Sequence, residues 1–456
     1  MKIALVFPRV RYPSGDPPLG LAYLAGMLEA KAGLDANIID LSFERRPFKF
    51  LRACLSKEKY DLIGISMMSS MVSAASRVAA IARQVQPDCL VAAGGPHPTM
   101  SAETVLKDPN IDLAVIGESE RTILELVSSF PRHEDVAGLA YVKNDRVVYT
   151  DRRQPIDELD DIPLPAWHRL PMQTYLRTWF QMDSVPGACP GTSVIASRGC
   201  PHRCTYCQPT LRTMFGQRLR KRSATGIARE IASLVERYQI RGFMFQDDTF
   251  TIDRKWAAQV ASEIWRSCPG IAWACNARAD TLDEGLLSHL RRHGLRKVNI
   301  GIETASQRVL DDIYQKDITV EQVRRSVRTA KEIDLMVQGY FMLGAPGETL
   351  AEVEETIRFA RDLPLDDATF SITTPLPGTE LWNRTKEAIQ PGTVDFDYYG
   401  QAVYRGQSID PATLRKLKRK AYLEFYLKPG RLPNLTRHLL LSGGPQKTLL
   451  KLRRLL

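Results

Sequence analysis

Short apolar runs alternate with helix-like stretches along most of the chain, and this alternation limits the possible folds more than any other feature. In the first 130 residues the apolar runs are four or five residues long, and from residue 191 they return at a wider spacing. Apolar runs this short, separated by helices, are typical of parallel strands that are covered on both faces. The sequence therefore predicts an α/β protein with two parallel sheets.

The first 135 residues are predicted to form a doubly wound domain around a five-stranded parallel sheet. The predicted strands are Ile3–Phe7, Ala36–Asp40, Leu62–Ser66, Leu90–Ala93 and Leu113–Ile116. In such a domain a ligand binds beyond the carboxyl ends of the strands. Residues 136–190 follow, and we expect a hairpin that turns at Lys143-Asn144-Asp145-Arg146 and then a proline-rich linker.

Residues 191–390 are predicted to form a partial, TIM-like (β/α)6 barrel. The predicted strands are Ser193–Ala196, Phe243–Gln246, Ile271–Asn276, Lys297–Ile302, Gly339–Leu343 and Thr369–Thr373. In barrels of this kind the catalytic residues gather at the carboxyl ends of the strands. Residues 391–456 are expected to form a basic, helical C-terminal region.

The composition indicates a cytoplasmic globular protein. Hydrophobic residues make up 44% of the chain and charged residues 25%, and no uninterrupted apolar stretch is long enough to span a membrane. Eight cysteines in 456 residues do not form a disulfide scaffold. Because three of them lie within eight residues, a metal site in a reducing compartment is the better interpretation.

The most specific motif directly follows the first predicted barrel strand. It reads Arg198-Gly199-Cys200-Pro201-His202-Arg203-Cys204-Thr205-Tyr206-Cys207. Iron–sulfur cubanes normally take four thiolates, so a loop with three leaves one iron open to a substrate, as in catalytic metal sites. The alternative is a zinc knuckle, for which His202 is the only local candidate as a fourth ligand.

The spacing C-x3-C-x2-C, with Tyr206 just before the last cysteine, resembles the radical S-adenosylmethionine (radical SAM) superfamily. The resemblance implies that Cys200, Cys204 and Cys207 hold a [4Fe-4S] cluster whose open iron binds S-adenosylmethionine. It also implies that an electron from this cluster cleaves S-adenosylmethionine to a 5′-deoxyadenosyl radical.

The ends of the later barrel strands resemble the same superfamily. The matching segments are Gln246-Asp247-Asp248, Asn276-Ala277-Arg278, Gly301-Ile302-Glu303, Gly344-Ala345-Pro346-Gly347-Glu348 and Pro375-Leu376-Pro377-Gly378. By this resemblance, the residues expected to bind S-adenosylmethionine are Tyr206, Asp247, Asp248, Arg278 and Glu303. The alternative is that each acid caps a helix or pairs with an arginine.

The first domain resembles the cobalamin-binding domain that precedes the barrel in one large branch of this superfamily. The matching segments are Pro17–Leu24, Ile65–Ser69, Ala93–Pro98 and Asp112–Glu118. The resemblance implies that Ser66, Gly94, Gly95 and Glu118 bind cobalamin.

One departure from the histidine-ligating cobalamin domains concerns the cobalt ligand. Those domains carry D-x-H-x-x-G after the first strand, whereas the loop Arg9–Asp16 contains no histidine. We therefore expect that no histidine of this loop ligates cobalt, and that His97 has a surface or capping role.

Basic charge is concentrated in the C-terminal region. Residues 411–456 hold twelve Lys or Arg and one acid, Glu424, while the whole chain has a net charge of +10. Leucines lie between these basic residues, which fits an interfacial helix on an anionic membrane. It fits equally a helix that packs on the barrel and exposes a basic face. The scarcity of aromatic residues argues against nucleic acid as a partner.

The resemblance implies an enzyme that uses cobalamin to methylate an unactivated carbon of a lipid-like or other hydrophobic metabolite. An alternative is cyclisation, oxidation or rearrangement, as in the porphyrin-cyclase relatives. An RNA methylthiotransferase would hold a second cluster on three N-terminal cysteines, and this chain has only Cys54 and Cys89 there. A non-catalytic corrinoid carrier would have no use for an open iron.

The expected partners follow from this hypothesis. They are a small-molecule substrate, either a lipid or a tetrapyrrole, and an external electron donor such as flavodoxin or ferredoxin. The basic tail adds a peripheral contact with the inner face of the membrane.

Overall fold

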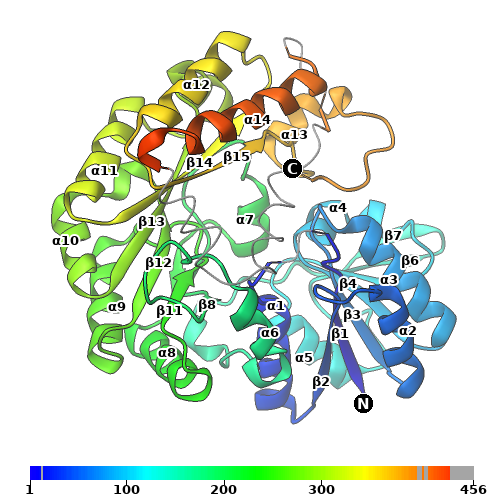
Figure 1. The fold of residues 1–456 in the computed structure, drawn as a ribbon. Coiled ribbons are helices and arrows are strands. Elements are labelled where there is room, and N and C mark those ends of the chain that lie inside the picture. Colours follow the sequence, from blue (N-terminus) through cyan, green and yellow to red (C-terminus); the bar gives the residue numbers. More distant parts are fainter. Residues whose placement is uncertain (12–13, 398–402, 405–408, 432–456) are drawn as a thin grey trace.

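The computed structural model describes residues 1–11, 14–397, 403–404 and 409–431, which form two α/β units lying side by side (Figure 1). The N-terminal unit and the barrel turn the carboxyl ends of their strands toward a shared central region. Among the described residues, no helix has the length and apolar character needed to cross a membrane.

The N-terminal unit is built on a seven-stranded sheet with the order β2-β1-β3-β4-β5-β6-β7. Its strands are β1 (Ile3–Phe7), β2 (Ala36–Asp40), β3 (Leu62–Ser66), β4 (Leu90–Gly94), β5 (Leu113–Val115), β6 (Leu139–Lys143) and β7 (Arg146–Tyr149). The first five are parallel and agree with the predicted strands to within one residue. The order 2-1-3-4-5 places the point where the connections diverge between β1 and β3.

The predicted hairpin is present, and it extends this sheet instead of standing apart from it. β6 pairs antiparallel with β5, and β7 pairs antiparallel with β6. Asn144 and Asp145 have φ values of 52° and 59°, as the two central residues of a type I′ turn require.

Helices cover both faces of this sheet (Figure 1). They are α1 (Leu19–Met27), α2 (Pro47–Lys57), α3 (Val72–Val85), α4 (Pro96–Val105) and α5 (Glu120–Ser129). Each amphipathic helix buries one stripe, as α3 does with Ala75, Val78, Ala79 and Ala82.

The second unit is an open barrel of six parallel strands in sequential order, which confirms the predicted (β/α)6 architecture. The strands are β8 (Gly191–Val194), β11 (Gly242–Phe245), β12 (Ala272–Ala277), β13 (Leu295–Glu303), β14 (Met336–Leu343) and β15 (Asp367–Ile372). A short two-stranded pair, β9 (Ser197–Arg198) with β10 (Arg220–Lys221), follows β8.

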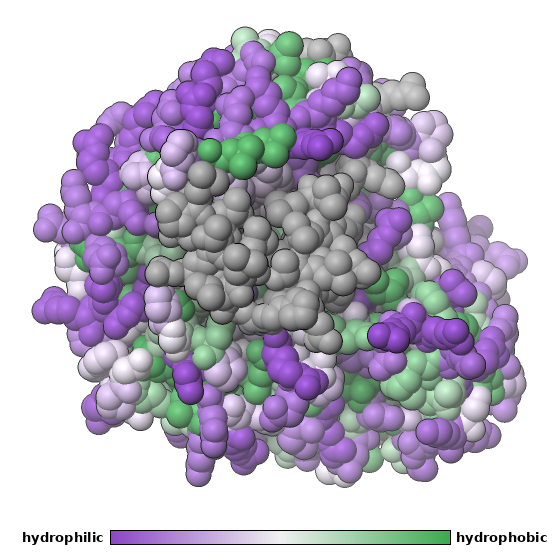
Figure 2. All heavy atoms as spheres, viewed as in Figure 1, coloured by the Kyte–Doolittle hydropathy of each residue, from purple (hydrophilic) through white to green (hydrophobic). Residues whose placement is uncertain are grey.

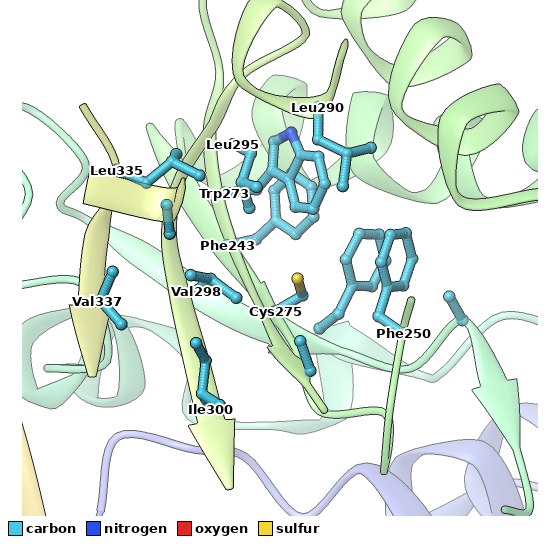
Figure 3. Packing of buried hydrophobic residues seen from close by; sticks show 14 of the residues in the cluster. Phe243, Phe250, Trp273, Cys275, Leu290, Leu295, Val298, Ile300, Leu335 and Val337 are labelled. Carbon is cyan, nitrogen blue, oxygen red and sulfur yellow. The ribbon is translucent and has the colours of Figure 1, made fainter. Parts of the chain in front are cut away.

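Helices form the outer layer of the barrel. They are α8 (Ala224–Tyr238), α9 (Arg254–Ser267), α10 (Glu284–Arg292), α11 (Val320–Glu332) and α12 (Leu350–Asp362). The short helix α7 (Thr210–Phe215) lies instead in the central region against α4 (Figure 1), and α13 (Glu380–Thr385) follows β15. The side chains of Ser223, Asp253, Thr319 and Thr349 accept hydrogen bonds from the first turns of α8, α9, α11 and α12. Val298 and Ile300 of β13 point into the apolar layer between strands and helices, together with Phe243 and Trp273 (Figure 3).

The segment between the two units is packed and is not a loose linker. It contains α6 (Met172–Thr178), and Trp179 just after α6 is fully buried. Ile156, Leu159 and Ile162 belong to the barrel core, while Ala166 belongs to the core of the N-terminal unit. The proline-rich stretch therefore joins the two units by filling the seam between them.

The described part of the C-terminal region forms α14 (Pro411–Tyr426), with Asp410 as its N-cap. Leu414, Leu417, Ala421 and Phe425 are buried against the barrel, where α14 lies beside α12 and β15 (Figure 1). For this stretch the structure favours the packed helix over the interfacial one. The leucine-rich segments 439–441 and 449–456 lie outside the described residues.

Candidate active site

Two cavities meet where the carboxyl ends of the two sheets face each other. The larger, of about 490 Å³, lies between the N-terminal unit and the barrel, and the smaller, of about 340 Å³, lies at the mouth of the barrel. Both are lined by Gln246, Asp247 and Asp248, which directly follow β11. A molecule in one cavity therefore touches part of the wall of the other.

All three motif cysteines line the smaller cavity. Cys200, Cys204 and Cys207 are free thiols, and the loop that carries them is fixed to the barrel through Thr205, whose hydroxyl donates to the Ile313 carbonyl at 2.6 Å. Burial raises the pKa of Cys200 to about 11 and also raises the pKa of Cys207.

The loop fits an iron–sulfur cluster in its choice of ligands and in the space beside it. The thiols have no disulfide partners and face one open cavity, and a bound metal removes the proton that burial would otherwise retain. In the described part of the chain no group of three or more His, Cys, Asp or Glu side chains is already arranged to hold a metal ion. These three thiols would supply the protein ligands of a cluster bound in this cavity.

The residues predicted to bind S-adenosylmethionine line the same cavity as the cysteines. Tyr206 donates a hydrogen bond to Glu303 at 3.2 Å, and the carboxylate of Glu303 also forms a buried ion pair with Lys316. Glu303 has a φ of 68° where the pairing of β13 with β14 shifts register, so its backbone is strained at the end of its strand.

Lys316 was not predicted. It lies thirteen residues after Glu303 and reaches the cavity because the π-helical segment η5 (Val309–Tyr314) returns the chain to the barrel mouth. No motif or spacing in the sequence marks this lysine as a site residue.

Arg278 lies against the cysteine loop. Its guanidinium donates to the sulfur of Cys204 at 3.6 Å and to the Lys316 carbonyl at 2.6 Å, and it pairs with Asp280 at 3.0 Å. Arg278 therefore has a carboxylate partner in the protein, and its side chain also faces the cavity.

The two carboxyl groups after β11 have different surroundings. Asp247 is fully enclosed and accepts hydrogen bonds from the Ser197 hydroxyl and from the Ala196 amide, the latter at 3.1 Å. Asp248 faces both cavities. Burial is the main cause that raises the pKa of each carboxyl to about 6.

The four residues predicted to bind cobalamin all line the larger cavity. They are Ser66, Gly94, Gly95 and Glu118. Gly95 has a φ of 113°, and a Cβ atom there would lie 3.0 Å from the Met67 carbonyl oxygen, so this turn requires glycine.

Glu118 has strong partners within the protein. Its carboxylate accepts hydrogen bonds from Arg198 at 2.8 Å and from Arg220 at 2.8 and 2.9 Å, as well as from the amide of Ile156. Burial opposes its ionisation, but the hydrogen bond from Arg220 and the charge of Arg198 outweigh burial and lower the pKa of the carboxyl.

His97 is buried, so the expected surface position is wrong. Its ring lies 3.2 Å from the hydroxyl of Ser69, and burial lowers its pKa to about 4. Neither His97 nor any other histidine lines the larger cavity in the described part of the chain.

Comparison with protein families gives two matches. The radical SAM superfamily matches residues 194–360, and the B12 binding domain matches residues 12–127. The first match spans the barrel strands β11 to β14, and the second spans the parallel strands β2 to β5.

Similar proteins include methyltransferases and a cyclase. An uncharacterized methyltransferase of Pyrococcus horikoshii is 36% identical, covering 94% of this chain and 93% of that protein. An anaerobic magnesium-protoporphyrin IX monomethyl ester cyclase of Rubrivivax gelatinosus is 30% identical, covering 93% and 79%. A cytidylyl-2-hydroxyethylphosphonate methyltransferase of Streptomyces wedmorensis is also 30% identical, covering 85% and 80%.

Two solved structures share this fold. A radical S-adenosylmethionine methyltransferase from Kitasatospora setae, with cobalamin and a [4Fe-4S] cluster bound, superposes with a TM-score of 0.71 at 19% identity, covering 85% of this chain and 74% of that one. A cobalamin-dependent S-adenosylmethionine radical enzyme, with aqua-cobalamin and S-adenosylmethionine bound, gives 0.74 at 16% identity, covering 99% and 74%.

Proposed function

Because the chain belongs to the radical SAM superfamily, in the branch with an N-terminal B12 binding domain, we propose that it is a cobalamin-dependent methyltransferase of an unactivated carbon. It uses a [4Fe-4S] cluster, S-adenosylmethionine and cobalamin. The observation that carries the proposal is the shared wall of the two cavities at Gln246, Asp247 and Asp248.

The shared wall matters because a methylation of this kind needs two reagents at one carbon. When bound, the cluster supplies the electron that cleaves S-adenosylmethionine to a hydrogen-abstracting radical, and cobalamin supplies the methyl group. Cys200, Cys204 and Cys207 hold the cluster, with S-adenosylmethionine beside Tyr206, Arg278 and Glu303. A substrate at the junction of the cavities reaches both.

The larger cavity favours a hydrophobic partner. Leu5, Leu19, Leu21, Leu24 and Ile65 contribute to its walls, and these apolar side chains suit a flat macrocycle and the apolar part of a substrate. We assign Ser66, Gly94 and Gly95 to cobalamin. The substrate we propose is a lipid-like or other hydrophobic metabolite.

Ring closure, oxidation or rearrangement is the second candidate reaction. It is supported by the similarity to the Rubrivivax cyclase over most of both chains. The two reactions differ in one product, because only methyl transfer converts S-adenosylmethionine to S-adenosylhomocysteine.

The test is product analysis under anaerobic conditions. The protein, loaded with cluster and cobalamin, is incubated with S-adenosylmethionine, a strong reductant, and lipid or porphyrin extracts, and the nucleosides are quantified by mass spectrometry. We expect 5′-deoxyadenosine and S-adenosylhomocysteine to rise together. 5′-Deoxyadenosine alone would favour the second candidate, and the appearance of neither from cluster-loaded protein would contradict both.

Two cysteine variants make this test specific to the cluster. Cys204→Ala should abolish 5′-deoxyadenosine. Cys54→Ala, on α2 of the N-terminal unit, removes a half-buried thiol far from the motif in sequence and should leave it unchanged.

The proposal includes two partners. An external donor such as flavodoxin or ferredoxin supplies the electron, and the basic face of α14, with Arg415, Lys416 and Arg419 exposed, contacts anionic lipid. Flotation with anionic vesicles tests the second partner. Because the apolar face of α14 is already buried, the contact should weaken as salt rises, and protein that stays below the vesicles at low salt would contradict it.

A further inference from the structure

A short row of side-chain amides lines the inside of the barrel, deeper than the charged residues at its mouth. Asn276 lies on β12 two residues before Arg278, and Asn299 lies on β13 four residues before Glu303. Both asparagines line the smaller cavity. Neighbouring strand residues point to opposite faces, so Asn299, between the outward-pointing Val298 and Ile300 in Figure 3, points into the barrel.

Hydrogen bonds fix which way each amide is turned. The backbone carbonyl of Asp247 accepts from the Asn276 amide nitrogen at 3.1 Å, so the Asn276 side-chain oxygen is turned toward Asn299. That oxygen accepts from the Asn299 amide nitrogen at 3.3 Å. Asn299 must therefore turn its own oxygen, Oδ1, away from Asn276.

This oxygen has no hydrogen-bond partner among the described residues. Asn299 is only 1% exposed, so bulk water does not reach its side chain freely. Buried polar atoms are almost always hydrogen-bonded in native proteins, so an unpartnered acceptor on a residue of the cavity wall is available to a donor that arrives with a ligand.

The surrounding residues narrow the chemistry of that donor. At the mouth, Glu303 is paired with Lys316 and Arg278 with Asp280, and the carboxyl groups of Asp247 and Asp248 lie beside these pairs. Deeper in the cavity the wall includes the uncharged polar side chains of Gln181, Asn276, Asn299 and Tyr340, together with the apolar side chain of Met244. A neutral acceptor among neutral groups suits a hydroxyl, or an amide or amine N–H, better than an ion.

We propose that Asn299 is a substrate-binding residue, and that the substrate carries a hydroxyl or N–H group close to its reacting carbon. The inference rests on the proposed function, because it places the substrate between the two cofactors. It narrows the substrate from a hydrophobic metabolite to an amphipathic one, whose polar end enters the barrel and whose apolar part lies toward the larger cavity.

The test compares two substitutions that each remove a buried, unpartnered polar atom from a barrel strand. Asn299→Leu removes the amide facing the cavity. Thr192→Val, on β8, removes an equally buried hydroxyl that lines neither the larger nor the smaller cavity, and so controls for a general effect on the barrel. Each loaded variant receives S-adenosylmethionine with a deuterated S-methyl group and a metabolite and lipid extract of anaerobically grown prokaryotic cells.

Two quantities are measured, the labelled methylated product and the 5′-deoxyadenosine formed without extract. For Asn299→Leu we expect the labelled product to fall about 100-fold, while 5′-deoxyadenosine stays within about twofold of wild type. Thr192→Val should keep both. The product itself should carry a hydroxyl or N–H near the new methyl group.

Other outcomes overturn the inference. Unchanged product formation by Asn299→Leu would show that the amide does not bind substrate, and a parallel loss of 5′-deoxyadenosine would show that it serves S-adenosylmethionine instead. If wild type makes no labelled product, the proposed methyl transfer is contradicted. The binding role of Asn299 is then tested separately, in crystals of the loaded protein soaked in acetamide or 1-propanol. A probe N–H or O–H on Asn299 Oδ1 would support it, and only water there would overturn it.

Discussion

Glu118 lies in the cavity where the sequence predicts it, but its contacts indicate a structural role. It lines the larger cavity, yet both carboxylate oxygens are held by arginines of the barrel unit. Arg198 also pairs with Glu120 and lies two residues before Cys200, so this buried network joins α5 to the start of the cysteine loop. The contacts point to a structural role at the seam between the units.

Glu118→Gln should therefore destabilise the protein strongly. Removing one charge from a buried ion pair leaves its partner uncompensated, at a cost of about 3–5 kcal/mol in the free energy of unfolding. Glu125→Gln is the control, because Glu125 pairs with Arg153 while half-exposed and should cost about 1 kcal/mol or less. Urea denaturation of both variants measures the difference, and equal costs would contradict a buried network.

The effect of Glu118→Gln on stability should also depend on pH. The pKa of Glu118 is lower in the folded protein than the ordinary value of about 4.3, so its ion pairs stabilise the fold at neutral pH. That contribution is lost as the pH falls through the folded pKa. The stability gap between wild type and Glu118→Gln should therefore shrink in acid, and a constant gap would contradict the assignment.

His97 carries the second prediction at this scale. Its ring is buried beside Ser69 and lines none of the larger cavity, so bound cobalt should have no histidine nitrogen from this residue. We expect the electron paramagnetic resonance spectrum of the cobalt(II) form to be the same in wild type and in His97→Gln, including any nitrogen splitting that the base of cobalamin itself produces. Splitting that disappears in the variant would refute this.

Site residues that lie close together in the sequence could be predicted from it. Contacts between residues that only the tertiary structure brings together could not. Three cysteines within eight residues must lie on one loop, whatever the fold of the rest of the chain. Lys316 pairs with Glu303 and Asp16 accepts from Gln181 only because the tertiary structure brings them together. Neither residue belongs to a local pattern.

Most of the strands were predictable because each is centred on a short apolar run between polar turns. β1, β2 and β3 have the predicted bounds, and those of the barrel strands differ by a few residues at their ends. The segment before the barrel was harder to interpret, because its prolines resemble a linker. What buries it is contact with both units, as when Trp179 packs against Gly15 and Gly191, and no local pattern reveals such contacts.

α14 carries the prediction at the scale of elements. Phe425 is 1% exposed and packs against Phe370 of β15, whereas Leu423 on the same helix is 47% exposed. Phe425→Ala should lower the free energy of unfolding by about 3–5 kcal/mol through the lost apolar contact and the cavity left behind. Leu423→Ala should cost about 1 kcal/mol or less, and similar costs in urea denaturation would argue against docking of α14 on the barrel.

At the scale of the whole molecule, the two units interlock near the candidate site. Asp16, in the loop after β1, accepts hydrogen bonds from Ser193 at 2.7 Å, Gln181 at 2.7 Å and Gln246 at 3.3 Å. In the segment between α13 and α14, the side chain of Asp395 accepts a hydrogen bond from the amide of Ser73 at the start of α3. The larger cavity exists only while the units stay docked, because each contributes part of its wall.

Cobalamin should therefore stabilise both units together. A ligand that binds only the folded protein raises the free energy of unfolding by about 2.7 kcal/mol at a concentration 100 times its Kd. A ligand that contacts both units stabilises both of them. We expect hydrogen exchange measured by mass spectrometry to slow in peptides from β4 and from β8 alike.

Asp16→Ala, which removes the acceptor of three hydrogen bonds across the seam, should limit the protection to β4. Asp157→Ala, which removes an exposed carboxylate paired with Arg218, should preserve the wild-type pattern. Protection of β4 alone in wild type would mean that cobalamin binds one unit without using the seam.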